Sequence, residues 1–110
     1  MSNKFKYITT AIVYPNNKIH LGWAWECLGA DWLARGYRVL GEETRFLTGM
    51  DEHSIKVVKR AEEAGMEPKA FCDQMASDIQ KSLTRLGISY DRFIRTSDED
   101  HKRVVQSLVQ

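Results

Sequence analysis

The amino-acid sequence predicts an α/β domain with a short parallel sheet and flanking helices. Strand-like and helix-like segments alternate along the chain in the order β-α-β-α-α-β-α. The first strand-like segment, Tyr7 to Tyr14, is almost wholly β-branched or aromatic and lacks polar alternation. That pattern is typical of a strand covered on both faces. The alternating order favours parallel strands joined by right-handed crossovers.

A long helix is predicted from about Leu21 to Leu40, after a break in the chain at Pro15-Asn16-Asn17-Lys18. Apolar residues recur in this helix at helical spacing. The stripe expected to face the core consists of Leu21, Trp25, Leu28 and Trp32. A second, shorter strand is expected at Thr44 to Thr48, and Gly49 ends it.

Two helices are predicted to follow the second strand. The first runs from Ser54 to Ala64 and stops at Gly65. Its inward residues are expected to be Ile55, Val58 and Ala61. The second begins at Pro68, which suits the first turn of a helix, and ends at Gly87. Its inward residues are expected to be Phe71, Cys72, Met75, Ile79, Leu83 and Leu86.

A third short strand and a final helix complete the predicted order. The strand is expected at Tyr90 to Thr96. Ser97-x-x-Asp100 resembles a capping box, which opens a helix that carries Val104, Val105 and Leu108. Three short parallel strands leave the outer edges of the sheet unpaired. We therefore expect residues 1–110 to be a single domain that forms the first half of a larger α/β domain, or to associate with a partner or with itself through the open edge.

The composition argues against several classes of protein. Sixteen Lys and Arg against fifteen Asp and Glu leave a net charge of +1, unlike a polybasic nucleic-acid arm or a charged membrane-surface helix. No run approaches the ~18 apolar residues of a membrane span, and no signal peptide is evident, so a cytoplasmic protein is predicted. Cys27 and Cys72 stand alone, which predicts reduced thiols and no Cys-x-x-Cys zinc site.

The candidate site lies where ligands bind in open parallel sheets, beyond the carboxyl ends of the strands. His20 and Gly22 stand at a predicted helix start, whose free N–H groups and partial positive charge favour phosphate. The second strand ends at Asp51-Glu52-His53, on the same edge of the sheet. The pattern predicts a site for a nucleotide and an amine-bearing substrate.

The same residues also fit structural roles. A lone histidine before a glycine at a helix start is commonly structural, and Asp51 fits equally well as a cap of the following helix. No metal site is expected at Asp51-Glu52-His53, because adjacent side chains point in different directions.

Several separate motifs keep one register from about Tyr7 to the C-terminus. They are Tyr7 to Tyr14, His20-Leu21-Gly22, Ala30-Asp31, Leu47 to His53 and Phe93-Ile94-Arg95-Thr96. Together they resemble methionyl-tRNA synthetases. The resemblance implies the first half of a class I synthetase catalytic domain, a partial Rossmann-type nucleotide-binding fold. It also implies that ATP with Mg²⁺ activates methionine to methionyl-adenylate for tRNA charging.

The resemblance further implies a role for each site residue. The family's His-Ile-Gly-His signature makes His20 the catalytic residue. The implied ATP-binding residues are His20, Gly22 and Trp23. The implied methionine-binding residues are Ile12, Tyr14 and Asp51. A carboxylate that faces a substrate ammonium forms a charge-assisted pair, which suits the place of Asp51.

The chain departs from the family pattern at the signature, which reads His20-Leu21-Gly22-Trp23. Indole has one N–H and cannot be protonated, so Trp23 either stacks on adenine or packs into the core. Ser54 replaces the family's glycine after Asp-Glu-His. The Lys-Met-Ser-Lys-Ser signature, the metal-binding insertion and the anticodon-binding domain have no counterpart. We therefore expect the chain to be incomplete on its own, and tRNA to bind only if those regions are supplied.

The leading prediction is thus a methionine–tRNA ligase catalytic fragment. A non-catalytic synthetase-like paralogue that binds adenosine nucleotide or methionine is the alternative, favoured by Trp23 and the missing second signature. A small nucleotidyltransferase is a third possibility, which rests on His20-x-Gly22 alone.

Overall fold

A three-stranded parallel sheet organises the computed structural model, which describes residues 5–15 and 18–110. The strands lie in the order β1-β2-β3, with bounds β1 (Lys6–Thr9), β2 (Thr44–Met50) and β3 (Arg92–Arg95). The helices are α1 (Leu21–Val39), α2 (Ile55–Glu63), α3 (Pro68–Arg85) and α4 (Glu99–Val109). The predicted α/β class with a short parallel sheet and flanking helices is confirmed.

The first two strands differ in length from the predicted ones. β1 ends at Thr9 rather than Tyr14, because its ladder with β2 breaks off and returns only as an isolated bridge between Val13 and Met50. β2 continues to Met50, so Gly49 lies inside this strand instead of ending it.

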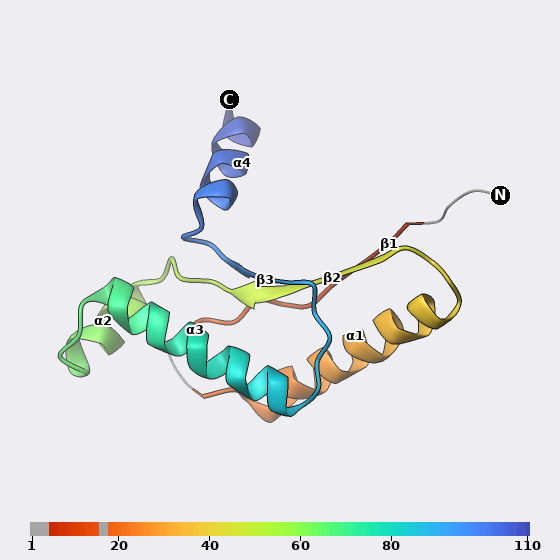
Figure 1. Cartoon of the computed structure of the whole chain (residues 1–110). Coiled ribbons are helices and arrows are strands. Elements are labelled where there is room, and N and C mark those ends of the chain that lie inside the picture. The colour runs from red at the N-terminus through yellow and green to blue at the C-terminus, as the bar shows by residue number, and fades with distance from the viewer. Residues whose placement is uncertain (1–4, 16–17) are drawn as a thin grey trace.

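The helices lie mainly on one face of the sheet. Figure 1 shows α1 and α3 on the same side, while α4 projects from the other side. Strands in sequence order produce this arrangement, because crossovers of one hand carry their helices to one face. The expectation that both faces of β1 are covered is therefore wrong, and Tyr7 on the open face is 59% exposed.

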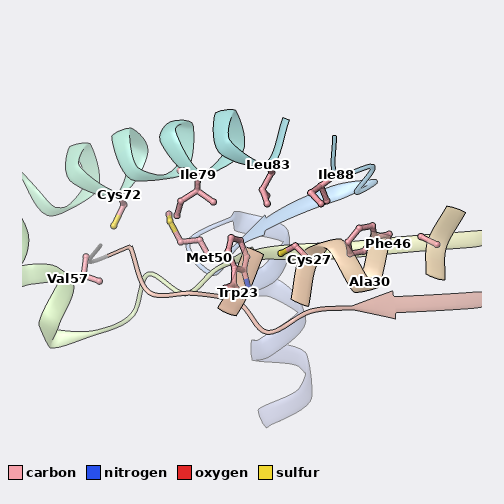
Figure 2. Packing of buried hydrophobic residues seen from close by; sticks show 12 residues of the cluster. Trp23, Cys27, Ala30, Phe46, Met50, Val57, Cys72, Ile79, Leu83 and Ile88 are labelled. Carbon is pink, nitrogen blue, oxygen red and sulfur yellow. The ribbon is translucent and has the colours of Figure 1, made fainter. Parts of the chain in front are cut away.

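The core forms between the covered face of β2 and the helices. Phe46 and Met50 of β2 are 1% and 0% exposed. In Figure 2 they meet side chains from α1 and α3, among them Trp23, Cys27, Ile79 and Leu83. The two cysteines, Cys27 and Cys72, are free thiols, as predicted, and both are buried.

The core-facing side of α1 is not the predicted one. Trp25 and Trp32 are 78% and 79% exposed, and Leu21 and Leu28 are exposed as well. The buried residues are instead Trp23, Cys27, Ala30, Asp31 and Ala34. The two stripes are offset by two residues, which places them roughly 160° apart around the helix. The smaller stripe faces the sheet because Ala and Cys let the helix approach the strands closely.

The inward residues of the later helices were predicted in part. In α2, Ala61 is buried as expected, but Ile55 is 75% exposed and Val57 takes the inward position in place of Val58. Leu86, the C-cap residue of α3, is expected inside but is 41% exposed. Cys72, Ile79 and Leu83 are buried as predicted.

The predicted helix stops are confirmed at two glycines. Gly65 follows α2 and Gly87 follows α3, with φ values of +66° and +71°. These left-handed conformations favour glycine because it has no Cβ.

The predicted capping box at Ser97 and Asp100 is wrong. The N-cap residue of α4 is Asp98, which makes no side-chain capping bond. Asp100 is occupied by Arg92, whose Nη2 donates to its Oδ1 over 2.8 Å. The predicted break at residues 15–18 includes Asn16 and Asn17, which lie outside the described residues.

Gly49 allows β2 and β3 to approach each other closely. A Cβ on Gly49 would lie 2.1 Å from the carbonyl oxygen of Ile94 and 2.4 Å from its Cγ2. The opposing atom is backbone, so it cannot swing away as a side chain would.

We predict that Gly49→Ala separates β2 from β3 and lowers the free energy of unfolding by at least ~2 kcal/mol, an overpacking effect. Urea unfolding followed by circular dichroism measures this loss. Gly29→Ala is the matched control, because Gly29 lies in α1 with no atom within 4 Å of the added Cβ. The control is expected to be neutral or to gain up to ~1 kcal/mol. Equal stability of the two variants would contradict the close approach.

Candidate functional site

The two segments of the candidate site lie side by side at the carboxyl edge of the sheet. Val13, beyond β1, forms its bridge with Met50 at the end of β2. The backbone N–H of Asp51 donates to the Val13 carbonyl oxygen over 2.8 Å. The chain that leaves β1 and the stretch from Met50 to His53 therefore converge, as predicted.

A pocket of about 330 Å³ opens next to this junction. Its lining residues are Ile12, Val13, Tyr14, Lys18, Ile19, His20 and Ile79. Ile12 and Tyr14 are 39% and 48% exposed, so both present apolar surface to a ligand. Asp51 does not line this pocket and reaches it only through the backbone of Val13.

Lys18 is a pocket residue that the sequence analysis missed. It lines the pocket together with His20. Its position two residues before His20 in the chain was the sequence signal that could have identified it. A lysine ammonium beside a helix start adds positive charge to a site that already favours anions.

His20 is the N-cap residue of α1. Its Nδ1 accepts a hydrogen bond from the Gly22 N–H over 2.9 Å. Because an acceptor nitrogen carries no proton, the neutral ring holds its hydrogen on Nε2, where it can donate to a ligand. A Cβ on Gly22 would lie 3.0 Å from this Nδ1, so glycine gives the ring its room.

Trp23 packs into the core, the second of the two roles left open for it. Its side chain is 7% exposed, and its Nε1–H donates to the Ala11 carbonyl oxygen over 2.8 Å. The single N–H of the indole is thus already paired. Trp23 as an ATP contact stays a prediction.

The chain between Thr9 and Val13 contains a bulge. Thr9 pairs with Leu47 and Val13 with Met50, so the first chain advances four residues (9 to 13) while β2 advances three (47 to 50). One extra residue therefore lies on the β1 side. The Ala11 N–H, inside the bulge, donates to Oε1 of Glu26 over 2.6 Å. Sequence reasoning missed Glu26, because its partner is fifteen residues away in the chain.

Asp51 does not cap the following helix, so that alternative is wrong. The N-cap residue of α2 is Ser54, whose side chain accepts from the Lys56 N–H over 3.2 Å. One oxygen of Asp51, Oδ1, accepts from the His53 N–H over 3.1 Å. Asp51 is half-buried at the sheet edge.

A partly buried ion-pair network joins the ends of β2 and β3 to α3. The Glu52 side chain is 4% exposed and lies 2.6 Å from Nη2 of Arg95. The same nitrogen lies 2.6 Å from Oδ1 of Asp73 on α3. Burial acts to lower the pKa of Arg95, but its bonds to Asp73 and Glu52 outweigh burial and raise it. The hydrogen bond from Arg95 lowers the pKa of Asp73. Sequence reasoning did not single out these three residues as a network.

The described residues contain neither a cluster suited to a metal ion nor a helix suited to span a membrane. Within residues 5–15 and 18–110, no group of three or more His, Cys, Asp or Glu side chains is placed to hold a metal ion. Over the same ranges, no helix combines the length and the apolar character that crossing a membrane requires.

Comparison with known proteins shows to which class of enzymes the chain is related. The family model described as tRNA synthetases class I (M) matches residues 6–110, so the chain belongs to the class I aminoacyl-tRNA synthetases. Within that class it belongs to the methionyl branch and corresponds to part of the catalytic region.

Methionine–tRNA ligases from several bacteria are similar over almost the whole chain. The one from Lactococcus lactis is 50% identical over 103 residues, which are 94% of this chain and 16% of that protein. The one from Streptococcus pneumoniae is 46% identical over 110 residues, 100% of this chain and again 16% of that protein. The chain therefore spans about one sixth of the length of these relatives.

A solved structure shows the same fold. Mycobacterium tuberculosis methionyl-tRNA synthetase in complex with methionyl-adenylate matches with a TM-score of 0.92 and 43% sequence identity. The match covers 96% of this chain and 21% of that chain. The fold is thus a Rossmann-like part of a methionyl-tRNA synthetase catalytic domain.

Cys27 of α1 lies in the hydrophobic core and provides a pH test of the core packing. It is 0% exposed, and burial is the main cause that raises its pKa to about 11. A thiol whose pKa is raised in the folded state stabilises the fold fully below its usual pKa, and this stability is lost as the pH rises towards 11.

We predict that the free energy of unfolding falls by about 2 kcal/mol more between pH 9 and 11 in the natural chain than in Cys27→Ser. Denaturant unfolding at several pH values measures the two slopes. Lysine and tyrosine titration affects both proteins alike, so the difference isolates Cys27. Identical slopes would mean that the thiol is not held neutral by burial.

Proposed function

We propose that this chain supplies the part of a methionine–tRNA ligase site that binds ATP and methionine for the formation of methionyl-adenylate. One observation supports this most directly. His20 lines one pocket with Val13, and the Asp51 N–H donates to the Val13 carbonyl oxygen over 2.8 Å at the carboxyl edge of a parallel sheet. The groups that would bind phosphate and ammonium are therefore linked through Val13 at this edge of the sheet.

In the proposed reaction, a methionine carboxylate oxygen attacks the α-phosphorus of ATP. A bond forms between that oxygen and phosphorus, the bond from the α-phosphorus to the bridging oxygen breaks, and pyrophosphate leaves. His20 would donate its Nε2–H to the phosphates, and Gly22 and the free N–H groups of α1 would lie against them. Trp23 is proposed to support the nucleotide-binding helix start from within the core.

The amino acid would bind against Ile12 and Tyr14, with its ammonium group directed past Val13 towards Asp51. The Asp51 carboxylate would pair with the ammonium group of methionine, a charge-assisted interaction. Ile12 and Tyr14 would form an apolar wall against the methionine side chain, in keeping with their place in the pocket.

The proposal includes partners beyond the small molecules. Mg²⁺ is proposed to arrive with the ATP phosphates as part of the substrate. Because the chain spans 16% of relatives such as the Lactococcus lactis ligase, tRNA is proposed to bind only together with further synthetase regions. The open edges of β1 and β3 are proposed as the place of self-association or of a partner, and the cytoplasm as the location.

A non-catalytic paralogue that binds nucleotide or methionine is the second candidate. One observation favours it. Trp23 stands in the last position of the signature and gives its N–H to Ala11, so it offers no N–H to a phosphate. Losing one donor of this kind from a transition state typically costs 10²–10³ in rate.

We predict that Asp51→Asn weakens methionine binding by at least ~10-fold and leaves ATP binding within about twofold, since only the ammonium loses its charged partner. Isothermal titration with each ligand measures both affinities. Asp78→Asn on α3 is the matched control, because its side chain is 56% exposed beside Lys81. Unchanged methionine affinity in Asp51→Asn would overturn the assignment of Asp51.

We predict that His20→Ala and His20→Asn both reduce methionine-dependent exchange of pyrophosphate with ATP by about 10²–10³. Only His20→Ala should also destabilise the fold, by about 1 kcal/mol, because asparagine remains a good N-cap. Binding of ATP or methionine without exchange, when the further synthetase regions are supplied with the chain, would support the paralogue. If the natural chain shows neither, both proposed functions fail.

A further inference from the structure

Both backbone groups of Ala11 bind side chains of α1 instead of β2. The Ala11 N–H donates to Oε1 of Glu26 over 2.6 Å, and the Ala11 carbonyl oxygen accepts from Nε1 of Trp23 over 2.8 Å. On either side of it, the N–H groups of Thr10 and Val13 donate to β2, over 3.3 Å and 3.4 Å. Ala11 is thus the point at which the ladder is interrupted and α1 takes over its pairing.

This interruption sets how the side chains of Ile12, Val13 and Tyr14 are turned relative to the core and the pocket. Successive residues of an extended chain point to opposite faces, so a slip of one residue exchanges the faces of all that follow. In the observed register Val13 is half-buried against the core and borders the pocket from that side, while Ile12 and Tyr14 line the pocket and are 39% and 48% exposed. A regular ladder without the extra residue would shift the register of Ile12, Val13 and Tyr14 by one.

Of the two α1 side chains that bind Ala11, Glu26 is the one that can be removed without leaving a cavity in the core. It is exposed, whereas Trp23 is 7% exposed and fills space between α1 and β2. A bond to a charged acceptor is roughly twice as strong as a neutral one, so the carboxylate stabilises a backbone N–H that the sheet leaves unpaired.

We propose that Glu26 is a positioning residue for methionine: its carboxylate holds the bulge at Ala11 and thereby keeps Ile12 and Tyr14 turned into the pocket. The inference rests on the proposed function, because it gives the pocket wall to methionine. Glu26 touches neither ligand in this scheme and acts through the backbone of Ala11.

The test compares Glu26→Ala and Glu26→Gln with the natural chain. Glu26→Ala is expected to weaken methionine binding by about tenfold and to leave ATP binding within about twofold. Glu26→Gln should recover most of the affinity, because its amide oxygen still accepts from the Ala11 N–H. Glu62→Ala, on the exposed surface of α2, is the control and should change neither affinity.

Backbone amide NMR of the same proteins reads the bulge itself. In Glu26→Ala the amide resonances of residues 10–14 are expected to shift, the Ala11 N–H to exchange faster with solvent, and Glu26→Gln to reverse both changes. If Glu26→Ala does not fold, Glu26→Asp takes its place, since it keeps the charge but withdraws the carboxylate by one methylene.

Three results would overturn the inference. The first is that Glu26→Ala binds methionine as tightly as the natural chain does. The second is that it loses affinity for methionine and for ATP equally. The third is that the amide resonances of residues 10–14 do not shift. A natural chain that binds no methionine overturns the proposed function instead. The NMR comparison then still decides whether Glu26 holds the bulge, because it requires no ligand.

Discussion

The pairing of Met50 with both neighbouring strands is the interaction on which the rest of the structure depends. Met50 is fully buried at the end of β2, pairs with Arg95 of β3 on one side and forms a bridge with Val13 on the other. Parallel strands end at the same edge, so this point gathers three carboxyl ends. The proposed nucleotide and methionine residues leave the sheet within a short distance of it along the chain.

Polar contacts to buried carboxylates join helices and strands elsewhere in the fold. Asp31 of α1 is 7% exposed and accepts bonds from the N–H of Ser89 and from Nε of Arg35, each over 2.7 Å. Burial acts to raise the pKa of Asp31, but these bonds hold it below its usual value. The ion pair of Glu52 and Arg95 likewise joins the ends of β2 and β3. Buried charges are tolerated in such places because each has a hydrogen-bonded partner.

The helix α1 shows where sequence patterns reach their limit. Its two apolar stripes have the same spacing, and the stripe with the larger side chains, Trp25 and Trp32, was predicted to face the core. The structure buries the stripe that contains Cys27 and Ala34. Periodicity reveals that a face is apolar, but it does not reveal which partner the face meets. The close approach of α1 to the sheet depends on small residues, which carry little weight in a hydrophobic pattern.

The sequence alone determined the order of the elements, the helix stops at Gly65 and Gly87, the parallel sheet and the candidate residues His20, Gly22 and Asp51. These follow from local signals, namely periodicity, glycine conformation and position at strand ends. Only the tertiary structure decided the bulge at Ala11, the burial of Trp23 and the network of Glu52, Arg95 and Asp73. Each of these joins residues distant in the chain through bond geometry, and such geometry exists only once the strands and helices have packed.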